Sequence, residues 1–129
     1  MQEIVIDVNS RQLLLPSSLT SLGVAGDKDV QRLRFLCPRY YFDCDFSNYD
    51  ICILFKNNDK EPGKYEVSDK TTDDENITFS WLVGEEALEE AGITEFSVCM
   101  SVTNTDGKEL NDFNTAISRL LVLEGLPDE

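Results

Sequence analysis

Histidine is absent from the sequence, and this absence removes several classes of enzyme. Without an imidazole there is no Ser–His–Asp triad, no Cys–His pair and no histidine-ligated metal ion. The glycine-rich loops that hold nucleotide phosphates are missing too, since neither G-x-x-x-x-G-K-[ST] nor G-x-G-x-x-G occurs. Paired carboxylates with glycosidase chemistry stay open, but 25 acidic residues make such a pair uninformative. The sequence therefore predicts a protein that is not an enzyme and that needs no cofactor and no metal ion.

Long apolar segments are also missing. No run approaches the roughly 18 to 20 residues that are needed to cross a bilayer. The first ten residues, MQEIVIDVNS, have no basic segment, and Asp7 interrupts their short apolar stretch, which is unlike a signal peptide. We therefore expect that the protein is made in the cytoplasm and does not associate with a membrane.

Basic residues are few. Eleven Lys and Arg against 25 Asp and Glu give a formal net charge of −14, distributed as +1 over residues 1–42 and −8 over residues 59–90. Because an anionic chain repels phosphate backbones, nucleic acid is not an expected partner. The acidity is typical of a charge that maintains solubility. A docking surface for a basic partner and a mimic of nucleic acid are the alternatives.

The four cysteines form no C-x-x-C pair. Cys52 and Cys99 lie in apolar segments typical of strands, so we expect reduced, buried thiols that pack as small apolar side chains. A disulfide between Cys37 and Cys44, or between Cys52 and Cys99, stays open at this point.

The segment NTDGKELND (104–112) is rich in oxygen-bearing side chains. Aligned with a calcium-binding EF-hand loop, it would place Val102 at the first ligand position and Phe113 at the last, and neither side chain binds calcium. The Asp106-Gly107 dipeptide instead predicts a tight β-hairpin turn.

Apolar residues recur at every second position through much of the chain, which is the period of a half-buried β-strand. The clearest segments are EIVIDV (3–8), VQRLRFLC (30–37), ITFSWLV (77–83) and FSVCMSVT (96–103). In the third of these, Phe79 and Trp81 share one face and Ser80 points to the other. The runs ICILF (51–55) and LLVL (120–123) are apolar throughout and predict central strands.

One short helix is predicted at about residues 85–91, because this segment consists of helix-forming residues, has acids in its first turn and ends at Gly92. Six to eight strands, one helix and no internal repeat favour a mainly β fold, a two-layer antiparallel β-sandwich. A partly open barrel is the alternative. We expect residues 1–126 to form a single domain and residues 127–129 to be a tail or the start of a linker.

Aromatic and basic residues gather around residue 40. Three consecutive rings, Tyr40, Tyr41 and Phe42, cannot all point inward from a strand. Exposed rings there would form a contact patch, whereas buried rings would close one end of the sandwich, which is the commoner fate of aromatics. The candidate interface residues are Arg32, Arg34, Arg39, Tyr40 and Tyr41. Arg32 and Arg34 also fit the solvent-facing side of their strand.

The order of these segments matches a known pattern. Gly26-Asp27 leads into VQRLRFLCPR (30–39), followed by FSNYDICILFKN (46–57), by ITFSWLVGEEALEEAGITEFSVCMSV (77–102) and by AISRLLVLEG (116–125). Over about residues 20–125 this resembles the N-terminal domain of phage upper-baseplate (BppU-type) proteins and related prophage tail components. The resemblance rests on pattern and spacing. It implies a β-sandwich that anchors one baseplate component to another and has no catalytic residues, although the family's domain usually heads a longer chain.

The sequence thus favours a non-enzymatic structural or assembly module of a phage or prophage tail baseplate. The resemblance implies synthesis in the cytoplasm of a host bacterium and incorporation into a tail. The expected partners are other tail or baseplate proteins, or the protein itself as a homo-oligomer, with no nucleic acid and no membrane. The alternatives are a glycan-binding β-sandwich, with Tyr40, Tyr41 or Trp81 as the stacking platform, and an acidic inhibitor that mimics nucleic acid.

Overall fold

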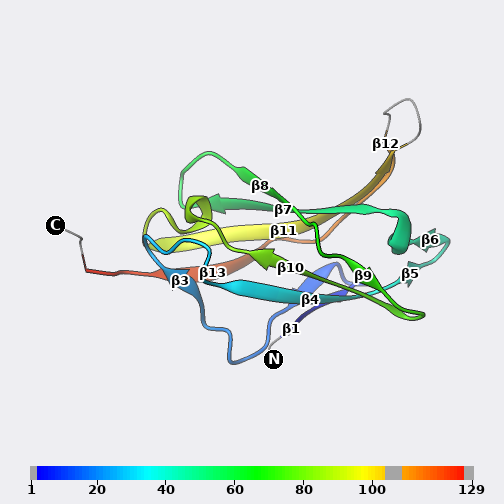
Figure 1. The fold of residues 1–129 in the computed structure, drawn as a ribbon, viewed down its shortest axis with the longest axis horizontal. Coiled ribbons are helices and arrows are strands. Elements are labelled where there is room, and N and C mark those ends of the chain that lie inside the picture. The colour runs from blue at the N-terminus through cyan, green and yellow to red at the C-terminus, as the bar shows by residue number, and fades with distance from the viewer. Residues whose placement is uncertain (1–2, 104–108, 127–129) are drawn as a thin grey trace.

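The computed structural model describes residues 3–103 and 109–126, and strands dominate this part of the chain (Figure 1). The strands are β1 (Glu3–Asp7), β2 (Gln12–Leu14), β3 (Ser21–Val24), β4 (Arg32–Pro38), β5 (Tyr40–Tyr41), β6 (Cys44–Asp45), β7 (Asp50–Asn57), β8 (Gly63–Glu66), β9 (Thr71–Thr72), β10 (Asn76–Leu82), β11 (Gly92–Thr103), β12 (Glu109–Asn114) and β13 (Ser118–Leu123). Two single-turn 3-10 helices, η1 (Phe46–Asn48) and η2 (Glu85–Leu88), complete the described elements. The mainly β prediction is confirmed.

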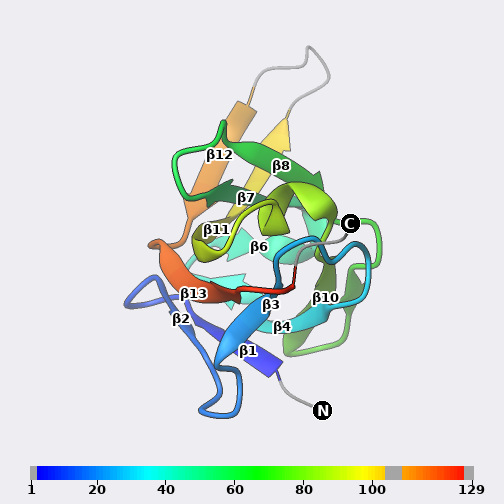
Figure 2. The same cartoon turned by 90° about the vertical axis from the view of Figure 1, so that its left-hand side faces the viewer.

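Two sheets pack face to face, as Figure 2 shows along the long axis. The first sheet has the order β2-β1-β4-β10-β9, and the second has the order β3-β13-β11-β7-β8, with β12 also paired to β11. Strands β5 and β6 form a separate hairpin. The predicted β-sandwich is therefore the observed architecture.

Most neighbouring strands are antiparallel, but β1 pairs in parallel with β4, and β3 pairs in parallel with β13. Parallel neighbours need a crossover connection between them. The chain supplies one by leaving the first sheet after β2, forming β3 in the second sheet and returning as β4 beside β1. Strand partners of this kind depend on the whole topology, which the pattern along the sequence does not contain.

The residues that the two-residue period placed inward form much of the core, and other segments add residues such as Leu22 and Phe46. Ile77, Phe79, Trp81 and Val83 are all buried, and so are their counterparts in the other alternating segments, except that Val102 is only partly buried. Phe35 stacks on Phe79 with ring centroids 5.1 Å apart. Register is fixed strongly in such strands, because a slip of one residue would turn the whole apolar set toward water.

The two continuously apolar runs take inner positions in the second sheet, as β7 and β13. Only one face of each is buried, however. Leu54, Leu121 and Leu123 point to the outer face of the sheet and are 39%, 50% and 46% exposed. An antiparallel sheet can leave one face in water, so an apolar run does not by itself imply burial on both sides.

The predicted helix at 85–91 is a single 3-10 turn, η2, that buries Ala87 and Leu88 at one end of the sandwich (Figure 1). It stops early because other groups take its backbone hydrogen bonds. The Thr94 hydroxyl donates to the carbonyl of Ala87 at 2.6 Å. The side chain of buried Asn57 accepts from the Glu90 N–H at 2.9 Å and donates to its carbonyl at 3.0 Å. These pairings replace those of a longer α-helix.

Three sequence-based expectations fall at least partly outside the described residues. The Asp106-Gly107 turn and most of the oxygen-rich segment at 104–112 lie there, although β11 and β12 on either side do pair antiparallel. The tail at 127–129 lies there as well. In the described part of the chain, no helix is long and apolar enough to cross a membrane.

Candidate functional site

The β5–β6 hairpin projects from one end of the long axis, opposite to the end where β13 leads toward the C-terminus (Figure 1). Tyr40 pairs with Asp45 and Tyr41 pairs with Cys44, so Phe42 and Asp43 form the two-residue tip. A two-residue connection requires backbone torsions that match the twist of its strands, and Phe42 takes a positive φ of 51°. The side chain of Phe42 is 86% exposed.

Arg39 holds this hairpin against the rest of the molecule. Its guanidinium makes two hydrogen bonds to the Asp45 carboxylate, at 3.0 and 3.1 Å, and a third, of 3.1 Å, to the carbonyl of Asp73. The backbone N–H of Arg39 also donates to the carbonyl of Glu75 at 2.9 Å. Arg39 therefore joins the hairpin to the turn between β9 and β10. We call the hairpin (40–45) together with this turn (73–75) the hairpin end.

Arg39 and Asp45, which form the clamp of this hairpin, each stabilise the charged form of the other. The hydrogen bonds from Arg39 hold the pKa of Asp45 far below its ordinary value of 3.8, and the same pair raises the pKa of Arg39. Asp45 also accepts a 3.0 Å hydrogen bond from the backbone N–H of Ser47, which caps η1. A bidentate pair between an arginine and a carboxylate fixes orientation as well as distance. Arg39 is thus a structural support of the hairpin, and its charge is neutralised locally.

Asp45→Asn should weaken the dependence of stability on acid pH. A carboxyl whose pKa is lowered on folding stabilises the folded state above its unfolded pKa, and this contribution is lost as the pH falls toward the folded pKa. The wild-type protein should therefore lose stability as the pH falls below about 4. The variant should start less stable at pH 7 and lose less over this range. Thermal unfolding followed by circular dichroism between pH 7 and pH 3 measures the slope of stability against pH for both proteins.

Asp43→Asn at the exposed hairpin tip is the matched control, since it removes one carboxylate two residues away without touching the clamp. It should retain the wild-type slope. Equal slopes for the wild-type protein and Asp45→Asn would show that this ion pair does not contribute to acid sensitivity.

Aromatic rings fill the space behind the hairpin. Phe46 is fully buried and meets Tyr49 and Phe113 edge-on, at centroid distances of 5.1 and 4.9 Å. Tyr41 is half-buried against Phe113, with the Arg11 guanidinium 5.3 Å from the centre of its ring. These rings close the end of the sandwich, as the burial interpretation expected.

The two other rings remain in water. Tyr40 is 52% exposed, with the Arg39 guanidinium 5.1 Å from its ring centre, and Phe42 is far more exposed. The contact-patch interpretation therefore fits Tyr40, and it fits Phe42, which was not among the candidate interface residues. The sequence indicated that at least one of the three consecutive rings is exposed. It could not indicate that Phe42 is one of them, because that depends on the geometry of the turn.

Arg32 and Arg34 lie elsewhere, on the outer face of the first sheet and toward the other end of β4. Arg32 donates to the Ser80 hydroxyl at 2.6 Å and lies 3.7 Å from the carboxylate of Asp69, which also binds Ser80. Burial works to raise the pKa of Asp69, but the hydrogen bonds from Ser80 outweigh it and the pKa is lowered. The structure therefore divides the five candidate residues between two surfaces, and Arg39, Tyr40 and Tyr41 stay together.

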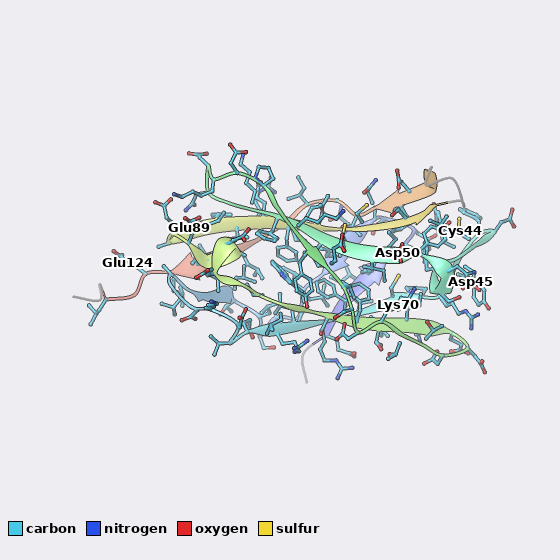
Figure 3. All side chains as sticks on the ribbon, turned by 45° about the horizontal axis from the view of Figure 1, so that its top comes forward. Cys44, Asp45, Asp50, Lys70, Glu89 and Glu124 are labelled. Carbon is cyan, nitrogen blue, oxygen red and sulfur yellow. The ribbon has the colours of Figure 1, made fainter. Side chains whose placement is uncertain are left out.

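The acidic residues are also distributed over more than one surface. Figure 3 shows Asp45 and Asp50 toward the hairpin end, whereas Glu89 and Glu124 lie at the other end. In the sequence the acidic stretch 59–90 is separate from the Arg- and Tyr-rich segment, but the fold brings residues 73–75 against Arg39. A mimic of nucleic acid needs its carboxylates on one face, and these carboxylates lie at both ends. Trp81 is fully buried and cannot stack on a glycan.

The four cysteines are not disulfide-bonded. Cys37 is buried, and burial raises the pKa of its thiol to about 12, whereas the other three are half-buried. Cys52 and Cys99 are direct neighbours across β7 and β11. Within residues 3–103 and 109–126, no three Cys, Asp or Glu side chains are grouped as a metal ion would require.

Comparison with known proteins gives a match in structure. No protein-family model matches the sequence, and no curated protein matches it. Among solved structures, the N-terminal domain of phage TP901-1 ORF48 is similar, with a TM-score of 0.57, 13% sequence identity and 95% of each chain covered. At this identity the likeness establishes the fold. The resemblance to an N-terminal domain of phage baseplate proteins, noted from the sequence, is thus confirmed as a shared fold over nearly the whole chain.

Proposed function

We propose that this protein is a non-enzymatic structural module of a phage or prophage tail baseplate, and that it acts through protein–protein contacts. The observation that carries the proposal is the fold shared with ORF48, a baseplate protein, over 95% of both chains. Fold alone does not determine function, since one fold can serve many. The absence of histidine and of phosphate-binding loops supports a role without catalysis.

The surface of the molecule is compatible with this role. The hairpin end presents Tyr40 and Phe42 on a support fixed by Arg39, and exposed aromatics on a rigid support are typical of protein interfaces. The partners would be other tail or baseplate proteins, or further copies of this chain. The protein would be made in the host cytoplasm and carried in the assembled tail, with no role for nucleic acid or membrane.

Quantitative mass spectrometry of purified phage particles tests the proposal. The protein should be present at a fixed number of copies per particle and should remain after a high-salt wash. Particles made without its gene should have incomplete baseplates in electron micrographs. Abundant protein in the lysate together with none in purified particles would refute the proposal.

A further inference from the structure

We propose that Phe42 is the anchor of a docking site that inserts into an apolar socket, rimmed by Lys and Arg, on another tail protein. The inference rests on the proposed function and adds to it a residue, a surface and a kind of partner. Four observations support it: the exposure of the ring, its strained backbone, the rigid support under it and the charge around it.

The exposure of Phe42 is costly and is not forced by the fold. An 86% exposed phenylalanine leaves almost its whole ring in water. Its φ of 51° lies in the left-handed region, which glycine or asparagine occupies with less strain than a bulky residue does. A hairpin tip selected only for folding would carry one of those residues. A strained residue at an exposed tip is a reason to look for a function.

The ring is held ready for binding. Tyr41 packs against it with centroids 4.7 Å apart and ring planes at 63°, and Tyr41 is itself fixed by Phe113 and Arg11. Below the tip, the Arg39–Asp45 pair locks the two strands of the hairpin. An anchor that is already ordered loses little conformational entropy when it binds. Buried aromatic anchors carry much of the free energy of many protein interfaces.

The charge around the anchor selects the partner. Asp43 is next to Phe42 at the tip, and Asp73, Asp74 and Glu75 form the exposed turn to which Arg39 attaches the hairpin. The positive charge of Arg39 is balanced by Asp45. A socket with acidic residues at its rim would be repelled, and this applies to the same end of a second copy. Lysine and arginine at the rim would complement the site and orient the encounter.

The outer face of the second sheet is the competing surface. Its exposed apolar side chains, among them Leu54 and Leu121, are interrupted by the Glu95–Arg119 ion pair at 2.9 Å. None of these residues has a positive φ, and none is nearly as exposed as Phe42. Docking through this face, in place of Phe42, is therefore the alternative that the experiment must distinguish.

The test replaces the phage gene with single variants and measures the protein in purified particles relative to the lysate. Phe42→Asn removes the ring and suits the left-handed backbone, and Phe42→Gly is a second variant that relieves the strain altogether. Val30→Asn is the matched control, because Val30 is also an exposed apolar residue and lies at the other end, where the backbones of its neighbours Asp29 and Gln31 bind that of Val83. Melting temperatures of the purified variants confirm that each one is folded.

We expect incorporation to fall at least tenfold for both Phe42 variants, with melting temperatures at or above that of the wild-type protein, and to be unchanged for Val30→Asn. The double variant Asp43→Lys, Asp74→Lys should lower incorporation severalfold. Normal incorporation of folded Phe42→Asn would overturn the inference and leave the proposed function intact. Particles that contain the variant but no longer adsorb to cells would also overturn it, in favour of a glycan contact. Absence of even the wild-type protein from particles would refute the proposed function and the inference together.

Discussion

Trp81→Ala should destabilise the fold by about 3–5 kcal/mol, a large share of the roughly 5–15 kcal/mol that holds a domain of this kind together. The indole is fully buried between the two sheets. It lies 5.6 Å from the ring of Phe55 and 5.5 Å from that of Phe96, measured between centroids. Removing it leaves a cavity that residues of both sheets cannot fill without moving. Urea unfolding monitored by circular dichroism measures the change in free energy.

Trp81→Phe is the control for this experiment, since it retains an aromatic ring and should cost clearly less than Trp81→Ala. A loss below about 1 kcal/mol for Trp81→Ala would place the indole outside the core. The idea of Trp81 as a platform for glycan stacking would then return. In the structure, Trp81 instead lies in the first sheet and packs against aromatic rings of the second.

Asn57→Ala should cost about 2–4 kcal/mol, because it deprives the buried Thr94 hydroxyl and both backbone groups of Glu90 of a partner at once. Asn57 is 1% exposed and binds both backbone groups of Glu90 and, at 3.0 Å, the Thr94 hydroxyl. Without the amide, Glu90 loses the partner that ends η2. We also expect faster amide hydrogen exchange over residues 85–90, as the turn loosens before the sheets do.

Asn57→Asp separates shape from hydrogen bonding. It has nearly the same size and can still accept from the Glu90 N–H, but an ionised carboxylate cannot donate to the Glu90 carbonyl. It should be at least as damaging as alanine. Asn48→Ala, at an exposed position in η1, should change stability by no more than about 0.5 kcal/mol. Equal, small losses for the Asn57 and Asn48 variants would contradict the role given to Asn57.

The sequence was sufficient to predict most of the core residues that the alternating strands contribute, because the alternation of a strand assigns its two faces whatever its neighbours are. Phe79 and Trp81 point inward for this reason, and Ser80 meets Asp69 on the outer face. The order of the strands in the sheets could not be predicted from the sequence. The parallel pairing of β1 with β4 arises from a chain crossing between the sheets, and no local pattern records it.

Two further differences have local physical causes. The helix expected at 85–91 shortened to η2 because Asn57, some 30 residues earlier, takes its hydrogen bonds. Arg32 and Arg34 separated from Arg39 because β4 ends at Pro38 and the chain turns into the hairpin. Tyr40 could be named from its neighbours in sequence. Phe42 could not, since its exposure depends on the turn at the tip of the hairpin.

A photo-crosslinking phenylalanine analogue at position 42 tests directly whether the hairpin end contacts another tail protein. Benzoyl-phenylalanine is apolar and aromatic like the native residue, so assembly should proceed, and the same analogue at position 121 reports on the outer face of the second sheet. After irradiation of purified particles, position 42 should form a covalent adduct with one tail protein, at a peptide that contains lysine or arginine beside apolar residues. No adduct at position 42, together with a clear adduct at position 121, would show that the outer face of the second sheet, and not the hairpin end, is the contact surface.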